Sequence, residues 1–292
     1  MRLGVCVLPE YPWAEAEPIW RRVEELGFSS AWTYDHITWT GLPSGPWYGA
    51  WPTLTAAAAA TSRIRLGTLV SSANFRHPVP FAQEIMSLDD ISGGRLTVGI
   101  GAGSINADAT VLGGPGWPTK ERAGRFAEFV EILDTMLTGA PQGRTHTTYK
   151  GTYYQAQDAR LEPGCPQLPR TPFALAVTGP RGLDLTVRYG QTWVCVDSAD
   201  AEKTRDEQFA HVAGLVAKLD QACERADRDP RSIDRLVLTG FGSDRPLASV
   251  PAFEDSRERY AELGFTDLVV HYPRPADPFA ASLDTLEAIA AL

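Results

Sequence analysis

A carboxylate and an imidazole stand next to each other just after Ser30–Tyr34, a short apolar segment with the pattern of a β-strand. Asp35 and His36 would then lie at the carboxyl end of that strand. Histidine gives or takes a proton near pH 7, and a neighbouring carboxylate can orient its ring. One interpretation is therefore that His36 transfers a proton and that Asp35 orients it. From position alone, an equally good interpretation is that Asp35 caps a turn and His36 bonds to the backbone.

Two other segments have the composition of ligand-binding turns. In Gly99–Ser104 glycines alternate, so no side chain blocks a ring or phosphate from the backbone. This segment follows the fourth apolar run and not the first, so it is not the dinucleotide-binding fingerprint. In Thr178–Arg181 a Gly-Pro turn opens a predicted helix, whose free N–H groups and dipole favour an anion. The candidate residues are Gly101, Gly103, Ser104, Thr178, Gly179, Pro180 and Arg181.

Aromatic side chains cluster in the sequence around the same region. They form either an apolar substrate wall or part of the core or a dimer interface, and the sequence favours neither: Trp13, Trp39, Trp47 and Tyr48. The segment Arg76–Pro78 is better explained as organising the turn before the next helix than as contacting substrate.

The elements that must position these residues alternate along the whole chain. Eight apolar strand-like runs each precede a helical pattern, the first strand at Leu3–Leu8 and the last helix at Phe279–Ala290. Parallel strands need such crossovers, and eight repeats in about 290 residues fit a closed (β/α)8 TIM barrel. We expect one domain over residues 1–292, interrupted by a surface hairpin or loop at 139–171, after the fourth helix.

The alternative is an open Rossmann-like sheet. That fold would be supported by a GxGxxG turn after the first strand, but the sequence there is Leu8–Pro12. In a TIM barrel the active site lies at the carboxyl ends of the strands, where all the candidate segments fall.

Composition excludes several function classes. Lys and Arg total 27 against 36 Asp and Glu, a net charge of −9, which disfavours nucleic acid or an anionic membrane as partner. The four cysteines form no CxxC pair and HExxH is absent, so we expect no metal site. Neither an export signal nor an apolar run of about 20 residues is present, which predicts a cytoplasmic protein.

The chain resembles the luciferase-like monooxygenase superfamily, specifically its F420-dependent oxidoreductases. The resemblance covers nearly the whole chain and is densest in four segments: Thr61–Thr68, Phe75–Pro78, Leu88–Gly103 and Gly151–Tyr154. It implies a barrel whose strand ends hold a flavin-like ring, and a homodimer. It also implies a non-prolyl cis peptide at Leu69–Val70 or Val70–Ser71 beside that ring, so Leu69, Val70, Ser71 and Ser72 join the candidate cofactor contacts.

The resemblance further assigns roles to the candidate segments. Asp35 and His36 match the Asp-His pair of the family's sugar-phosphate and alcohol dehydrogenases, where the histidine acts in proton transfer, and Trp39 matches a tryptophan that lines the pocket. Thr178–Arg181 matches the phosphate-binding turn.

Two departures from the family pattern matter. Ser104 stands where the sugar-phosphate dehydrogenases have a glutamate, and their phosphate-holding basic residues have no clear counterpart, which disfavours that substrate. The segment Gly240–Pro251 is short where many members carry a long insertion, which predicts an open mouth or a lid from another loop or subunit.

We therefore predict an F420-dependent oxidoreductase that passes a hydride between the deazaflavin and a small organic substrate. The first alternative is an FMN-dependent luciferase-like monooxygenase, because reduced FMN can also activate O₂. The second is a non-catalytic flavin- or deazaflavin-binding protein.

Overall fold

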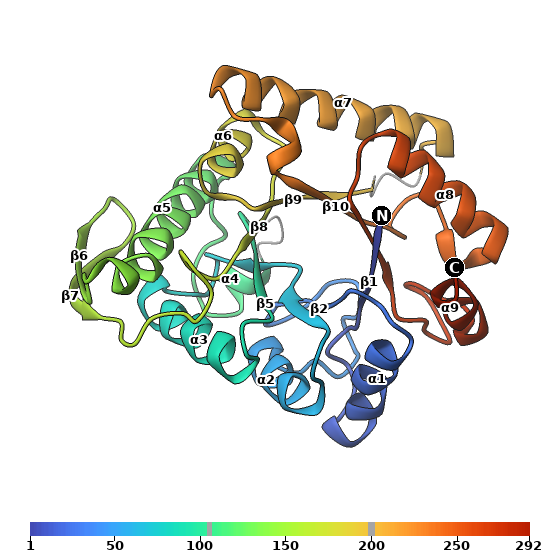
Figure 1. Ribbon diagram of the computed structural model, residues 1–292, viewed down its shortest axis with the longest axis horizontal. Helices are drawn as coiled ribbons and strands as arrows, with labels where there is room; N and C mark the ends of the chain where they lie inside the picture. Colours follow the sequence, from blue (N-terminus) through green and yellow to red (C-terminus); the bar gives the residue numbers. More distant parts are fainter. Residues whose placement is uncertain (104–106, 198–201) are drawn as a thin grey trace.

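The barrel is closed. A computed structural model describes residues 1–103, 107–197 and 202–292. Eight parallel strands follow one another around a single sheet, and β3 pairs with β5 through Leu66–Leu96 and Gly67–Thr97, which confirms the barrel against the open sheet (Figure 1). The strands are β1 (Arg2–Cys6), β2 (Ser30–Thr33), β3 (Arg65–Thr68), β5 (Leu96–Gly101), β8 (Phe173–Ala176), β9 (Thr192–Val196), β10 (Asp234–Leu238) and β11 (Asp267–His271).

Helices surround the sheet on the outside (Figure 1). They are α1 (Trp13–Glu25), α2 (Ala50–Ala60), α3 (Pro78–Ile91), α5 (Thr119–Leu137), α6 (Pro180–Tyr189), α7 (Arg205–Arg225), α8 (Val250–Glu262) and α9 (Leu283–Ala290). Each buries one apolar stripe against the strands; on α5 Phe126, Phe129 and Leu133 are at most 2% exposed. Short 3₁₀ turns are η1 (Ala140–Gln142), η2 (Pro230–Ser232) and η3 (Pro246–Ala248).

The excursion predicted at 139–171 contains an antiparallel hairpin outside the barrel, β6 (His146–Lys150) and β7 (Gln155–Arg160). The Glu128 carboxylate on α5 accepts hydrogen bonds from the backbone N–H groups of Thr152, Tyr153 and Tyr154. This contact fixes the hairpin to the outer layer, so it does not interrupt the barrel.

Two predicted elements have different bounds in the structure, and one short helix was not predicted. The strand predicted at Ile64–Ser71 breaks at a cis peptide between Leu69 and Val70 and resumes as β4 (Ser71–Ser72). A short helix that the sequence pattern did not predict, α4 (Ala107–Thr110), follows β5. The last helix begins at Leu283, where the Ser282 hydroxyl accepts from the Asp284 N–H, so Phe279 belongs to the preceding loop.

The barrel interior is filled and does not form a pore. Trp32 on β2 is in register with Gly67 on the neighbouring strand β3, and a Cβ added to Gly67 would come within 2.4 Å of the Trp32 ring and 2.5 Å of the Thr97 carbonyl oxygen. A side chain at position 67 would therefore collide with this layer. The inner cluster also includes Cys6, Leu69, Val194, Leu236 and Val269, all at most 5% exposed.

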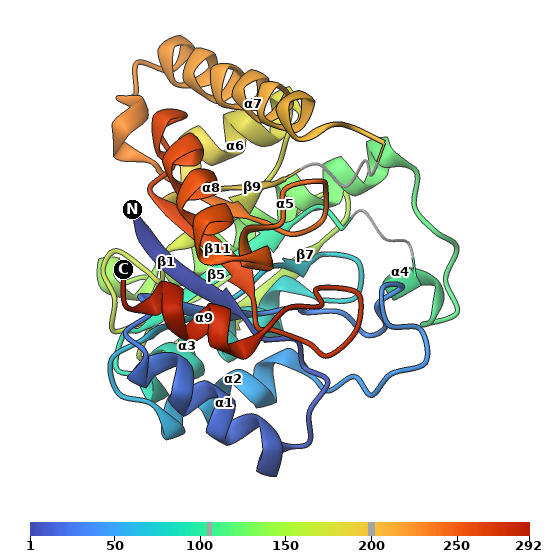
Figure 2. The same ribbon diagram turned by 90° about the vertical axis from the view of Figure 1, so that its right-hand side faces the viewer.

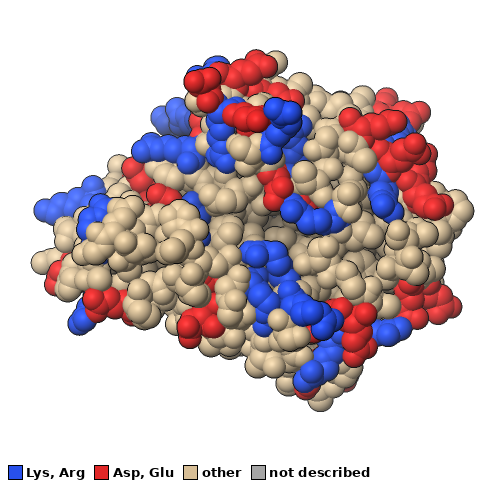
Figure 3. Space-filling view, viewed as in Figure 1, with Lys and Arg blue, Asp and Glu red and all other residues tan. Residues whose placement is uncertain are grey.

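The two ends of the barrel differ in their chemistry. Both chain termini lie at the end where the strands begin, and the long loops extend from the opposite end (Figure 2). Figure 3 shows the end where the strands begin, with basic side chains gathered around a central hollow. Arg2, for example, pairs there with Asp267 and Asp234. In TIM barrels this end serves stability, whereas the opposite end carries the active site.

Candidate functional site

His36 follows β2 at the mouth of the barrel and is held by a carboxylate that comes much later in the chain. Its Nδ1 lies 2.6 Å from Oδ2 of Asp108, on α4. The other oxygen of Asp108 accepts from the backbone N–H groups of Ile37 at 2.7 Å and Thr38 at 3.3 Å, and the carboxylate is almost fully buried. A carboxylate only accepts, so Nδ1 carries the hydrogen and Nε2 is left for a ligand.

Asp35 does not orient His36, contrary to the sequence prediction. Its carboxylate accepts from the Arg76 guanidinium at 2.6 and 2.7 Å, from the Ser71 hydroxyl at 2.5 Å and from the Trp51 indole at 3.2 Å. Successive side chains of an extended segment point to opposite sides, which separates these neighbours. Asp35 instead ties the end of β2 to the turn after β4.

The prediction for Arg76–Pro78 holds. Arg76 bridges Asp35 to Glu84 on α3, where its Nη1 lies 2.9 Å from the glutamate oxygen. The His77 ring accepts from the Val79 N–H at 3.3 Å and caps the amino end of the same helix. Both residues therefore organise the turn and the helix, and neither is a candidate for substrate contact.

One half of the mouth is filled by an aromatic cluster. The ring of Phe279 lies parallel to that of His271, with centroids 3.4 Å apart, and nearly parallel to that of Trp39, with centroids 6.1 Å apart. Trp39 contacts Trp47, whose indole N–H donates to the His36 carbonyl oxygen at 2.9 Å. The cluster comprises Tyr34, Trp39, Trp47, Phe241, His271 and Phe279.

Of the four predicted aromatic residues, two lie in this cluster. Trp39 is buried and Trp47 half-buried, whereas Trp13 and Tyr48 are 36% and 44% exposed at the surface. The loop Tyr272–Ser282 brings Phe279 over the mouth, and Arg274 fixes that loop by pairing with Glu10 at 2.7 Å. The loop Tyr272–Ser282, and not the short Gly240–Pro251 segment, thus covers part of the mouth. The sequence had predicted either an open mouth or a lid from another loop or subunit.

His271 is held in its neutral form at the end of β11. Its Nδ1 donates to the Thr239 carbonyl oxygen at 3.0 Å, so Nε2 accepts from the Tyr34 hydroxyl at 2.6 Å. Burial lowers the pKa of His271 from 6.5 to about 3. Because both ring nitrogens are already bonded, His271 fixes the aromatic cluster and is a poor candidate for proton transfer.

This pKa predicts a measurable loss of stability in acid. As pH falls below 6.5 the unfolded chain protonates this imidazole, whereas the folded chain does not until about pH 3. Proton uptake therefore favours unfolding, and between pH 6.5 and 4 the free energy of unfolding falls by up to about 1.4 kcal/mol per pH unit from this group. Urea unfolding at several pH values should show a shallower slope for His271→Gln than for the wild type; equal slopes would contradict the neutral assignment.

The other half of the mouth is lined by small or incompletely covered residues. Val196 is 39% exposed although its strand position faces the barrel axis, and Val70 and Ala176 are half-buried. A Cβ on Gly101 would lie 2.6 Å from Cγ2 of Val70, so the glycine lets Val70 pack against β5. The cis peptide implied by the resemblance is present at Leu69–Val70. This half offers an open apolar face for a flat ring.

The remaining predicted cofactor contacts divide into buried and exposed groups. Leu69, Ser71 and Ser72 are at most 5% exposed, and Ser71 is bonded to Asp35, so these side chains support the site from behind. Thr178, Gly179, Pro180 and Arg181 are exposed at the start of α6, beside β8. Gly103 is half-buried against Asn74, and Ser104 lies outside the described residues.

Asp108 and Phe279 are the site residues that sequence reasoning missed. A further missed acid is Asp197, at the end of β9, whose buried carboxylate accepts from the N–H groups of Gly240 and Phe241 at 2.8 and 3.1 Å. Burial raises the pKa of Asp197 to about 7. A polar residue directly after a buried strand was the available signal for Asp197, the same signal that identified His36.

Two features are absent from the part of the chain that the structure describes. No three His, Cys, Asp or Glu side chains within it are arranged to hold a metal ion. No helix within it is both long and apolar enough to cross a membrane.

Comparison with known proteins gives a consistent family. Residues 1–244 match the luciferase-like monooxygenase family. The chain is 29% identical to an F420-dependent glucose-6-phosphate dehydrogenase of Beutenbergia cavernae over 86% of this chain and 85% of that protein. It is also 29% identical to 4-hydroxyprotoasukamycin monooxygenase of Streptomyces nodosus subsp. asukaensis, over 97% and 71%.

The coverage of other relatives is smaller. The match spans 60–64% of the length of three further F420-dependent glucose-6-phosphate dehydrogenases.

Among solved structures, an F420-dependent secondary alcohol dehydrogenase in complex with an F420-acetone adduct has a TM-score of 0.77 at 19% identity, over 92% of each chain. That likeness shows a shared fold.

Proposed function

Because the chain belongs to the luciferase-like monooxygenase family, we propose that it is an F420-dependent oxidoreductase that acts on a small organic substrate. The observation that carries this proposal is His36 at the end of β2, whose Nδ1 is held by buried Asp108 and whose Nε2 has no hydrogen bond to the described residues. The F420-dependent relative, similar over most of both chains, supports the choice of coenzyme.

The residues present fit a flat tricyclic ring with a phosphate-bearing side chain. The open face formed by Val70, Gly101, Ala176 and Val196 would hold the ring, since it combines small side chains with uncovered apolar surface. The start of α6 at Gly179–Arg181 would hold the phosphate, because its free N–H groups and Arg181 are exposed to solvent there. When bound, the deazaflavin supplies or accepts a hydride.

His36 supplies the matching proton transfer. When the substrate is an alcohol, Nε2 accepts the hydroxyl proton as the carbon gives up hydride; in the reverse direction Nε2 returns a proton to the carbonyl oxygen. Asp108 fixes the tautomer that leaves Nε2 basic and stabilises the imidazolium that forms. The aromatic residues Trp39 and Phe279 exclude water from the half of the mouth that the aromatic cluster fills.

Replacing Asp108 by asparagine should lower kcat by about 10²–10⁴-fold, the range that a positioned proton-transfer group contributes. The amide keeps the shape of the side chain but lets either oxygen or nitrogen face His36, so the ring loses its fixed tautomer and its counter-charge. Steady-state kinetics with the reduced or oxidised coenzyme measure the change. Urea unfolding of the same variant separates the two roles: a lowered kcat in a stably folded variant supports the positioning role, whereas a destabilised variant that keeps the wild-type kcat would mean that Asp108 acts only on folding.

Titration of the purified protein with oxidised F420 and, separately, with FMN tests the cofactor. We expect F420 to bind tightly and to show the fluorescence change of a ring entering an apolar site, and Arg181→Gln to weaken it. Binding of neither compound would remove the main support for the proposal. The exposed Arg144→Gln, on the loop before the outer hairpin, is the matched control and should bind as the wild type does.

An FMN-dependent monooxygenase is the second candidate, favoured by similarity to the Streptomyces monooxygenase over 97% of this chain. It predicts tight binding of FMN alone and O₂ uptake with reduced FMN. A non-catalytic binding protein is disfavoured by the His36–Asp108 pair, since coenzyme binding alone requires no activated imidazole.

A further inference from the structure

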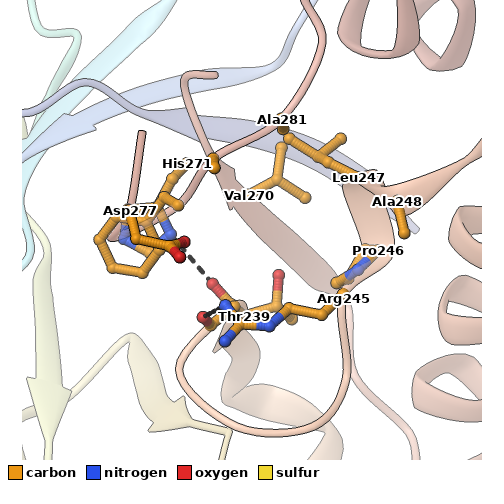
Figure 4. A pocket seen from close by; sticks show the side chains of 12 residues that line it. Thr239, Arg245, Pro246, Leu247, Ala248, Val270, His271, Asp277 and Ala281 are labelled. Carbon is orange, nitrogen blue, oxygen red and sulfur yellow. Dashed lines mark hydrogen bonds between the residues drawn. The ribbon is translucent and has the colours of Figure 1, made fainter. Parts of the chain in front are cut away.

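A cavity outside the reaction site lies at the carboxyl ends of β10 and β11 (Figure 4). Its volume is about 310 Å³, at the lower end of the range for small-molecule sites, so it has room for a small ligand. His271 and Phe279 form part of its wall and also belong to the buried aromatic cluster, whose packed rings separate the cavity from His36. A molecule in this cavity would therefore be a ligand in its own right and not the reacting substrate.

The inner walls of this cavity are apolar or already satisfied. Leu247, Val270 and Ala281 present aliphatic groups on one side, and His271 lies across from them (Figure 4). Both nitrogens of His271 are bonded within the protein, to the Thr239 carbonyl and to a tyrosine hydroxyl. A polar group placed deep in the cavity would lose its hydration without gaining a partner there, whereas an aliphatic group gains burial.

Two opposite charges stand at the rim of the cavity and are not paired with each other. Arg245, which follows β10, and Asp277, on the loop over the mouth, both line the cavity and are both exposed. Nη1 of Arg245 donates to the Gly240 carbonyl oxygen at 2.6 Å. Within the described part of the chain neither side chain has an ion-pair partner, so the rest of the guanidinium and the Asp277 carboxylate are left for a ligand.

The carboxylate at the rim is held in place before a ligand arrives. Nη1 of Arg274 donates to the carbonyl oxygens of Ala276 at 3.1 Å and Pro278 at 2.7 Å, the residues on either side of Asp277. Arg274 is itself fixed by its ion pair with Glu10 at 2.7 Å. A site whose charged group is already positioned binds without the cost of ordering that segment.

The pair of charges selects the kind of ligand. A ligand with a single charge would be attracted by one rim group and repelled by the other, and a phosphate dianion would gain no net attraction. A molecule that carries both a carboxylate and an ammonium group satisfies the two: the Arg245 guanidinium donates to the carboxylate, and the Asp277 carboxylate accepts from the ammonium group. The apolar interior then requires that the remainder of the molecule be aliphatic.

We propose that this cavity binds a free α-amino acid with an aliphatic side chain, such as leucine. Its two charged groups lie at the rim between Arg245 and Asp277, and its side chain lies against the aliphatic inner wall. Because the two charges come from different segments of the chain, the ligand joins the segment after β10 to the loop over the mouth. The site goes beyond the proposed function and does not depend on the coenzyme.

Calorimetric titration of the purified full chain with a matched set of compounds tests the three parts of the ligand. We expect leucine to bind. Asparagine has the same two charges and a side chain of similar shape that is polar, so it should bind at least about tenfold more weakly. The compounds 3-methylbutylamine and 4-methylpentanoate each keep the aliphatic part of leucine and lack one charge, and each should lose about tenfold.

Variants assign each part of the ligand to its residue. Arg245→Gln should weaken leucine by about tenfold without weakening 3-methylbutylamine, and Asp277→Asn should weaken leucine without weakening 4-methylpentanoate. Ala248→Trp and Ala281→Trp fill the cavity and should abolish binding of leucine. Ala276→Trp, exposed on the same loop but outside the cavity, should bind leucine as the wild type does.

Four results would overturn the proposal: no binding of leucine, equal affinity for leucine and asparagine, binding of leucine that survives in both cavity-filling variants, or an affinity that neither charge variant changes. Circular dichroism of each variant establishes that it is folded before it is titrated. The outcome is separate from that of the F420 titration, because leucine should bind with the same affinity in the presence and absence of the coenzyme.

Discussion

His36→Ala should lower kcat by about 10²–10⁴-fold while leaving the affinity for the coenzyme nearly unchanged. The imidazole is half-buried at the edge of the mouth, and its side chain is bonded to Asp108, so its removal takes away the proton-transfer group without opening the barrel core. Stopped-flow measurement of coenzyme reduction or oxidation gives the rate. Fluorescence titration of F420 on the same variant gives the affinity.

His36→Gln provides a sharper version of the same comparison. Glutamine can donate to Asp108 but cannot take up a proton, so it should restore the local packing and leave the rate low. His146→Ala, on the exposed outer hairpin, should turn over at the wild-type rate. If His36→Ala keeps the wild-type kcat at saturating substrate, proton transfer at this residue is excluded.

The barrel was accessible from sequence because its signals are local. Alternating strand and helix patterns, Gly27 after α1 and the glycines before β5 each report on a few neighbouring residues, and their order alone implies parallel strands. Closure is a different kind of fact. Closure depends on the pairing of β3 with β5. At this pairing Gly67 has no side chain, which leaves room for the ring of Trp32 from β2.

His36 could be found from sequence for the same reason, since a polar residue directly after a buried strand is a local signal. Its partner could not. Asp108 lies 72 residues further along, and only the folded barrel brings α4 back over the end of β2. The adjacent Asp35 looked like the natural partner, but the alternation of an extended backbone sends it to the other side.

Phe279 shows a second limit of predicting structure from sequence. An apolar residue a few positions before a helix fits the helical period, so the pattern extended α9 to include it. In the structure Phe279 has a φ of +67° and its ring stacks on His271. A residue with a left-handed backbone is set by tertiary contacts, here those of Arg274 within the loop, and no local period encodes them.

Asp35→Asn should lower the free energy of unfolding by about 3–5 kcal/mol. The Asp35 carboxylate is 2% exposed and accepts two bonds from Arg76, which is itself largely covered. Removing its charge leaves the Arg76 guanidinium largely buried, and among the described residues its remaining ion pair is with the half-exposed Glu84. The bonds from Ser71 and Trp51 weaken as well, because both donors point at the same oxygen. Urea or thermal unfolding measures the loss.

Glu84→Gln is the matched control, since it removes the exposed carboxylate from the same guanidinium. Its side chain is 46% exposed, and such surface pairs contribute about 0–1 kcal/mol. The double variant Asp35→Asn with Arg76→Gln should cost less than the sum of its single changes, because it no longer leaves a buried charge unpaired.

Kinetics of the folded Asp35→Asn protein decide between the two roles assigned to this residue. If Asp35 only joins β2 to the turn after β4, kcat well below the unfolding temperature should stay within a few-fold of the wild type. If it oriented the imidazole, kcat would fall as far as it does in Asp108→Asn. The structure predicts the first result, because the nitrogen of His36 that needs a carboxylate already has Asp108 at 2.6 Å.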